Sequence, residues 1–130
     1  MSDKPTILEA ESLYHVYESK AEDGNVVALR GIHVNVKEGE AVAVVGPSGS
    51  GKSTLLKCLG GLMKPSAGKV SLDEKNMTRL TGLELVELRQ KTVSFIFQEG
   101  NLLPHLSALD NVAQPLRHQK VSPKEAKRRA

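Results

Sequence analysis

The chain has 130 residues, of which 39% are hydrophobic and only 3% aromatic, so its core must be built from aliphatic side chains. Lysine and arginine exceed aspartate and glutamate by 18 to 15, and so small an excess does not indicate nucleic acid or anionic lipid as a partner. Cys58 is the only cysteine, which excludes an intrachain disulfide. No apolar run approaches the roughly 20 residues that span a bilayer, so we expect any membrane role to need a partner chain.

The N-terminal third of the sequence has the pattern of β-strands separated by turns. Ile32, Val34 and Val36 alternate with polar residues, which is the period-two pattern of a strand with one face in water. The run 41–45 holds no polar side chain, as is typical of a strand covered on both faces. We predict strands over 6–17, 26–29, 32–36 and 41–45, with turns over 20–25 and 38–40.

Helices are predicted to dominate the rest of the chain. Leu55, Leu59 and Leu62 recur at helical spacing, which predicts a helix from about residue 52 that ends near Gly60. Short strands are expected at 70–72 and 93–97. Three pairs of a capping residue and an acidic residue three positions later predict further helix starts: Thr81 with Glu84, Ser107 with Asp110, and Ser122 with Glu125. Pro115 is expected to cut the second of these helices short.

A phosphate-binding loop is the most specific motif in the sequence. Residues 46–53 match the pattern G-x-x-x-x-G-K-[ST] at every position. An apolar strand is predicted before the loop and a helix after it, which is the context in which this pattern binds phosphate. Glycines let backbone N–H groups turn inward, and the helix start adds its unpaired N–H groups. The sequence therefore predicts that Lys52 reaches the β- and γ-phosphates and that the Ser53 hydroxyl binds Mg²⁺. The alternative is an ordinary Gly/Ser-rich connection between a strand and a helix.

The chain also resembles the first half of an ABC-transporter nucleotide-binding domain. Gly60-Gly61 and the stretch 101–112 make it most similar to the branch that serves lipoprotein release, macrolide export and antimicrobial-peptide export. The segments that carry the family resemblance are Ala28-Leu29-Arg30-Gly31, Glu38-Gly39-Glu40, the phosphate loop with Thr54-Leu55-Leu56, Leu59-Gly60-Gly61-Leu62, Lys64-Pro65-Ser66-Ala67-Gly68 and Phe95-Ile96-Phe97-Gln98.

The resemblance implies a fold and a division into domains. The expected fold is α/β, a P-loop NTPase core with an antiparallel β layer, truncated at the start of a helical subdomain. Residues 1–99 would form the incomplete nucleotide-binding core, and residues 100–130 the start of the helical subdomain. In this family the Walker B strand lies beside the strand that enters the phosphate loop, which here is the run 41–45.

The resemblance also assigns site residues. Tyr17 is expected to stack on adenine with its ring rather than its hydroxyl, and Tyr14 is the alternative aromatic. Gln98 would contact Mg²⁺ and the attacking water, so Lys52 and Gln98 are the expected catalytic residues and Ser53 and Gln98 the expected Mg²⁺ ligands. The expected ATP contacts are Tyr17, Gly46, Pro47, Ser48, Gly49, Ser50, Gly51, Lys52, Ser53 and Thr54.

A relative of this kind binds MgATP and couples its hydrolysis to export or lipoprotein release. The expected partners are a transmembrane permease and a second ATP-binding subunit, with the protein peripheral on the cytoplasmic face of the membrane and not bound to nucleic acid. The Leu-Ser-Gly-Gly-Gln signature, the Walker B carboxylates and a switch histidine do not occur in these 130 residues, so turnover by this chain alone is not expected. The alternatives are a soluble ABC-type ATPase without a transporter, acting in translation or DNA repair, and a truncated product with weak or no activity.

Overall fold

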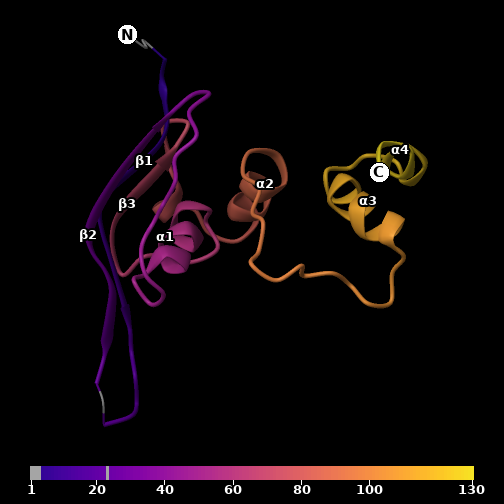
Figure 1. Ribbon diagram of the computed structural model, residues 1–130. Coiled ribbons are helices and arrows are strands. Elements are labelled where there is room, and N and C mark those ends of the chain that lie inside the picture. The colour runs from indigo at the N-terminus through magenta and orange to yellow at the C-terminus, as the bar shows by residue number, and fades with distance from the viewer. Residues whose placement is uncertain (1–3, 23) are drawn as a thin grey trace. The chain divides into compact units, whose positions relative to one another are not determined.

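The computed structural model describes residues 4–22 and 24–130, which form two compact units (Figure 1). The first unit is Met1–Leu85 and the second is Val86–Ala130. The predicted boundary between core and helical subdomain, after residue 99, lies inside the second unit and stays a prediction.

A four-stranded antiparallel sheet in the order β2-β1-β3-β4 is the framework of the first unit (Figure 1). The predicted N-terminal strand is confirmed, whereas the two strands predicted over 26–29 and 32–36 form one strand, because a bulge at Gly31 (φ 74°) lets the ladder continue through it. The strands are β1 (Thr6–Tyr17), β2 (Val26–Lys37), β3 (Ala67–Leu72) and β4 (Lys75–Asn76).

A second bulge, at Ser12, decides which side chains of β1 face the core. Ala10 and Leu13 are both buried although they are three residues apart, whereas a regular strand repeats every two residues. Ser12, with φ 49°, takes up the extra residue. From Leu13 onward the odd-numbered positions share the core face, so Tyr17 lies on that face. Tyr14 lies on the other face, with its hydroxyl oxygen 2.9 Å from where a Cβ of Gly31 would be.

Helix α1, Lys52–Leu59, packs against β1 and β2 (Figure 1). The helix begins at the predicted residue and ends at Gly60, so Leu62 lies beyond it. Burial raises the pKa of the Cys58 thiol, which keeps this side chain neutral and apolar within the core. The buried apolar side chains of the first unit are Ala10, Leu13, Leu29, Leu55, Cys58, Leu59, Val70 and Met77.

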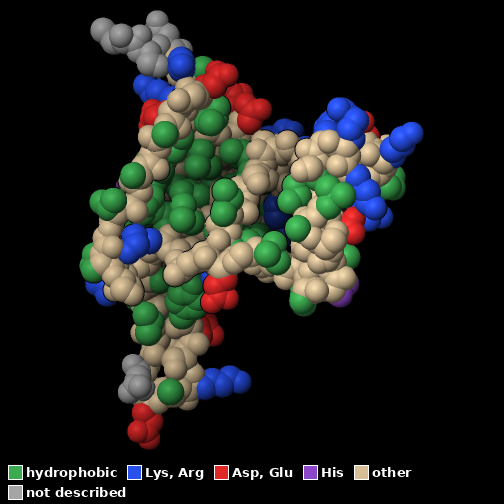
Figure 2. All heavy atoms as spheres, turned by 45° about the vertical axis from the view of Figure 1, so that its right-hand side comes forward, with side chains coloured by type: hydrophobic (Ala, Val, Ile, Leu, Met, Phe, Trp, Pro, Cys, Tyr) green, Lys and Arg blue, Asp and Glu red, His purple; other side chains and the backbone are tan. Residues whose placement is uncertain are grey.

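The two apolar runs predicted as core strands, 41–45 and 93–97, do not form strands, and those predictions are wrong for the described chain. Strands are held by hydrogen bonds from a neighbouring strand, and no described strand pairs with either run. The side chains of 41–45 are all exposed, with Val45 at 87%, whereas in 93–97 Ile96 is 95% exposed and Val93 and Phe95 are half-buried. Figure 2 shows that hydrophobic side chains are widely visible on the surface of the first unit.

The remaining helices begin where the sequence predicts. Helix α2 (Leu83–Lys91) follows a 3-10 turn, η1 (Met77–Arg79), and the second unit holds α3 (Ala108–His118) and α4 (Pro123–Arg129). The Ser107 hydroxyl accepts a hydrogen bond from the Asp110 N–H at 3.0 Å, and the Ser122 hydroxyl accepts one from the Glu125 N–H at 3.3 Å. Both of these predicted caps are confirmed.

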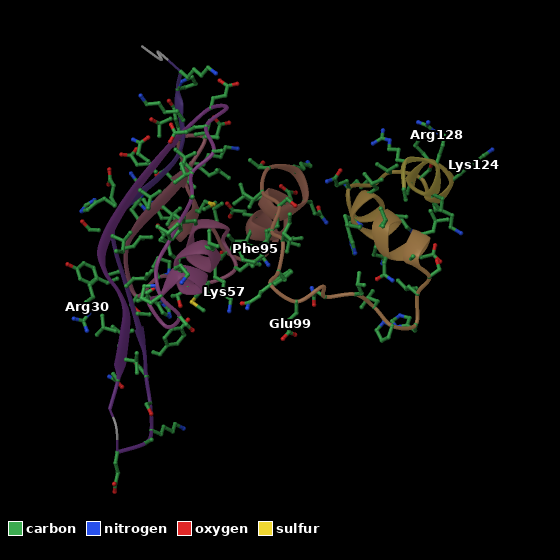
Figure 3. All side chains as sticks on the ribbon, viewed as in Figure 1. Arg30, Lys57, Phe95, Glu99, Lys124 and Arg128 are labelled. Carbon is green, nitrogen blue, oxygen red and sulfur yellow. The ribbon has the colours of Figure 1, made fainter. Side chains whose placement is uncertain are left out.

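The prediction that Pro115 ends α3 is wrong, because the helix continues to His118. Proline removes one N–H from the helix, and here the side chain is exposed, so its ring meets solvent rather than a packed neighbour. The two helices of the second unit contact each other, and each buries one alanine, Ala113 and Ala126. Figure 3 shows Lys124 and Arg128 on the surface of α4.

Gly68 is the position where β3 passes closest to the bulge in β1. A Cβ at Gly68 would lie 2.4 Å from the carbonyl oxygen of Ser12, and its φ is +100°. We expect Gly68→Ala to lower the free energy of unfolding by about 3 kcal/mol, because the new methyl group meets rigid backbone and the φ is strained. Thermal and urea denaturation of the full chain measure this loss. The matched control is Gly82→Ala, which has φ +55° and open space around its Cβ, and should cost only about 1–2 kcal/mol. Equal losses at the two glycines would contradict the close approach.

Candidate functional site

The loop 46–53 leads directly into α1, and its glycines differ in the space around them. Gly51 is the residue before the helix and has φ 97°. A Cβ at Gly51 would lie 2.5 Å from the carbonyl oxygen of Ala28, and one at Gly46 would lie 2.9 Å from the Ser50 hydroxyl. Gly49 has φ 80° and open space around it. The loop is thus packed closely onto β2 at one end and is open in its middle, where a ligand could approach the backbone.

The start of α1 has the properties of an anion site. No described side chain caps it, and its first turn holds no acidic residue. The first N–H groups of a helix have no partner within the helix, and the aligned peptide dipoles place partial positive charge there. At the other end Lys57 occupies the last turn (Figure 3), where a cation complements the dipole. The N-terminal N–H groups of α1 are therefore available to a phosphate.

Lys52 bends back over the loop that precedes it. Its ammonium donates hydrogen bonds to the carbonyl oxygens of Gly46 and Pro47, the latter at 2.8 Å. The Ser50 N–H donates to the same Pro47 carbonyl at 3.2 Å, which closes a turn. Among the described residues the ammonium is hydrogen-bonded to these two neutral carbonyl oxygens, which a charged phosphate oxygen can replace.

The residues present fit a nucleoside triphosphate with its magnesium ion. The ammonium of Lys52, the open start of α1 and the glycine backbone supply donors, and the Ser53 side chain is exposed. Mg²⁺ takes oxygen ligands and usually keeps few from the protein, so one hydroxyl beside phosphate oxygens suits it. Residues 4–22 and 24–130 contain no cluster of three or more His, Cys, Asp or Glu side chains that could hold a metal.

Tyr17 lies beside the start of α1, and its hydroxyl oxygen is 2.8 Å from the Thr54 hydroxyl oxygen. The Tyr17 hydroxyl also donates to the sulfur of Met63 at 3.6 Å. Thr54 is 8% exposed and Tyr17 is 39% exposed, so the anchored end of the ring is covered and part of the ring is open. With the Thr54 hydroxyl engaged, the predicted ATP contact of Thr54 would have to come from its backbone N–H. The sequence-based expectation gave a role to the Tyr17 ring and none to its hydroxyl, so it did not anticipate the hydrogen bond between Tyr17 and Thr54.

His15 lies next to Tyr17 and was not singled out from the sequence as a site residue. The two rings are 4.7 Å apart between centroids and inclined by 76°, which is an edge-to-face arrangement. The Nδ1 atom of His15 is buried and has no hydrogen-bond partner in the described structure. The only sequence signal for this contact is the spacing of two residues in a strand, which puts both side chains on one face.

Gln98 is exposed and follows the extended run 93–97 in the second unit. Phe95 and Phe97 of that run have ring centroids 4.9 Å apart, and Phe95 and the exposed Glu99 are marked in Figure 3. The phosphate loop and Lys52 belong to the first unit. The predicted contacts of Gln98 with Mg²⁺ and with water stay a prediction.

Comparisons with known proteins show the family to which the chain is similar. The family described as ABC transporter matches residues 29–130. An uncharacterized ABC transporter ATP-binding protein from Thermotoga maritima is 43% identical over 124 residues, covering 95% of this chain and 52% of the relative. The lipoprotein-releasing system ATP-binding protein LolD 2 from Caulobacter vibrioides is 43% identical over 130 residues, covering 100% of this chain and 55% of the relative.

A solved structure, the dimeric post-hydrolysis state of the ATP-binding cassette MJ0796 bound to ADP and Pi, superposes with a TM-score of 0.87. MJ0796 is a protein of Methanocaldococcus jannaschii, and the match has 37% identity over 95% of this chain and 53% of that chain. This likeness confirms the predicted α/β fold of the P-loop NTPase type.

The chain spans about half the length of the curated relatives it matches. In the part of the chain that the structure describes, no helix is both long and apolar enough to cross a membrane. With a family match over residues 29–130 and a phosphate loop of the geometry described above, the chain belongs to the ABC transporter family, as part of an ATP-binding component.

Proposed function

We propose that this chain binds MgATP through the loop 46–53 and α1, as part of a transport ATPase. The observation that supports this most directly is the open start of α1, uncapped by described side chains, with the Lys52 ammonium resting on the Gly46 and Pro47 carbonyls. A triphosphate would replace these neutral acceptors with charged oxygens, which bind an ammonium more strongly.

Each residue has a part in the proposed reaction. Lys52 and the backbone N–H groups of the loop would stabilise the negative charge of the β- and γ-phosphates, and this stabilisation matters most in the transition state. Ser53 would orient a Mg²⁺ ion, which supplies further charge neutralisation when bound. Gln98 would contact the same ion and the attacking water. Tyr17 would stack on adenine.

The proposed partners are a transmembrane permease and a second ATP-binding subunit. The lipoprotein-releasing relatives, including LolD 2, favour export or lipoprotein release as the driven process, and the MJ0796 cassette was solved as a dimer. We therefore propose a protein peripheral on the cytoplasmic face of the membrane.

Copurification from solubilised membranes tests this proposal in the full-length context. Recovery with a polytopic membrane protein would support it, whereas recovery only with ribosomes or DNA would favour the soluble alternative.

Ser53 offers a test of the proposed MgATP site that is specific to the metal. We expect Ser53→Ala to lower the affinity for MgATP by about tenfold, because the substitution removes the hydroxyl group that would bind the charged Mg²⁺ ion. The affinity for ATP measured with a chelator present should change little. Isothermal titration of the full chain with ATP, with and without Mg²⁺, separates the two effects. Ser53→Thr is the control, since it keeps the hydroxyl that the motif requires, and a loss that is equal with and without Mg²⁺ would contradict the assignment.

A further inference from the structure

Three side chains form a row between the sheet and the phosphate-loop helix: His15, Tyr17 and Thr54. His15 and Tyr17 lie on the same face of β1 beyond the Ser12 bulge, and their rings meet edge to face at 4.7 Å. The Tyr17 hydroxyl then meets the Thr54 hydroxyl at 2.8 Å. Thr54 directly follows Ser53 in α1, so the row ends on the helix that begins at the phosphate loop.

The row fixes the Tyr17 ring at two points. The hydroxyl bond to Thr54 fixes the far end of the ring, and Thr54 itself is buried and so cannot easily move. The bond leaves the ring free to turn about the line from Cβ to the hydroxyl, and contact with His15 from the side limits that rotation. In an edge-to-face pair one ring covers at most one face of the other, so at least one face of Tyr17 is left clear of His15.

The Nδ1 atom of His15 shows what kind of contact this residue makes. It is buried and has no hydrogen-bond partner among the described residues. Buried polar atoms are normally paired, so the position does not use histidine for a hydrogen bond through Nδ1. The contribution of His15 is its flat ring, which packs against the Tyr17 ring. A phenylalanine at position 15 would supply the same contact.

We propose that His15 is a positioning residue that holds the Tyr17 ring in the orientation needed to stack on the base of the bound nucleotide, together with the Thr54 hydroxyl. This inference rests on the proposed MgATP site. Stacking depends on the ring plane being fixed before the base arrives, since an aromatic ring that must be ordered on binding costs affinity. Through Tyr17, His15 therefore affects how tightly the base is bound and has no effect on how tightly the phosphates are bound.

The test compares a nucleotide with a ligand that has phosphates but no base. Isothermal titration of the full chain with MgATP and with magnesium tripolyphosphate should show that His15→Ala weakens MgATP about three- to tenfold, the range expected for one aromatic pair. The affinity for tripolyphosphate should stay unchanged. His15→Phe should restore MgATP binding, because it keeps the ring and removes the unpaired nitrogen. A thermal melt of each variant reports whether it is folded, and if His15→Ala is not, the comparison of His15→Phe with His15→Leu replaces it.

A double-mutant cycle identifies the residue through which His15 acts. Tyr17→Ala removes the ring, so adding His15→Ala to it should cause no further loss of MgATP affinity. Losses that add would overturn the proposal, and so would a His15→Ala loss that is equal for tripolyphosphate, or no loss at all. A wild-type chain that binds neither ligand would instead refute the proposed function, and this inference with it.

Discussion

In the full-length context, Lys52→Ala is expected to reduce the affinity for MgATP by about tenfold to a hundredfold and to reduce hydrolysis further. A charged hydrogen bond is worth about 1.5–3 kcal/mol in binding, and the same contact stabilises more charge in the transition state. The fold should survive, because the hydrogen bonds of the ammonium in the described structure are local, to the carbonyls of Gly46 and Pro47 in the loop that precedes it. Calorimetry measures the affinity, phosphate release measures the rate and a thermal melt measures the stability.

Lys57 is the matched control for this experiment. It lies in the last turn of the same helix, at the end away from the loop (Figure 3). Lys57→Ala removes the same charge from α1 but leaves the phosphate site alone, so it should leave MgATP affinity nearly unchanged. Should both lysine variants bind and hydrolyse ATP like the wild-type chain, the assignment of the phosphate site would be refuted.

The measurements on the other variants are made in the full-length context, whereas residues 1–130 expressed alone are expected to self-associate, to melt without a cooperative transition and to hydrolyse MgATP at background level. The self-association and the non-cooperative melt follow from the run 41–45, which is apolar at every position and uncovered, with Val45 87% exposed. The background hydrolysis is expected because the Walker B carboxylates do not occur in residues 1–130. Unpaired backbone and apolar side chains together form a template for pairing with another chain. Apolar side chains left in water contribute no burial energy, against a total stability of only about 5–15 kcal/mol for a domain. Size-exclusion chromatography with light scattering, calorimetric melting and an ATPase assay measure the three properties.

Val45→Lys provides the control for the self-association. It places a charge in the exposed run without removing a buried side chain, so it should lower the apparent mass of the assemblies. Gly82→Ala changes a residue outside the run and should leave the mass as it is. If wild-type residues 1–130 are monomeric, melt cooperatively and hydrolyse ATP rapidly, this uncovered run does not govern their behaviour.

The features that could be predicted from the sequence are those set by neighbouring residues. The phosphate loop and the Ser107 and Ser122 caps depend on contacts within a few positions, and the structure has both caps where the sequence places them. The start of α1 at Lys52 follows from the same local pattern. Pro115 was misjudged because proline weakens a helix without always ending it: it removes one N–H and crowds the carbonyl of Asn111, yet α3 continues through it to His118.

The features that could not be predicted depend on residues far apart in the chain. The apolar run 41–45 has the composition of a buried strand, but pairing decides whether a strand forms, and composition does not report a partner. The contact between Tyr17 and Thr54 joins residues 37 positions apart. The sequence gives no sign of it, because the distance between the two hydroxyls is set by how α1 packs on the sheet.

The bulge at Ser12 makes β1 tolerant of one kind of sequence change and intolerant of another. Exchanging a side chain in the strand alters one contact. Deleting or inserting one residue near Ser12 would instead swap the two faces of everything downstream, moving Leu13 to solvent and Tyr17 away from α1. Among natural variants of this chain, length changes in β1 should therefore occur in pairs that cancel, while exposed positions away from the site, such as Glu9 and Glu11, can change in identity.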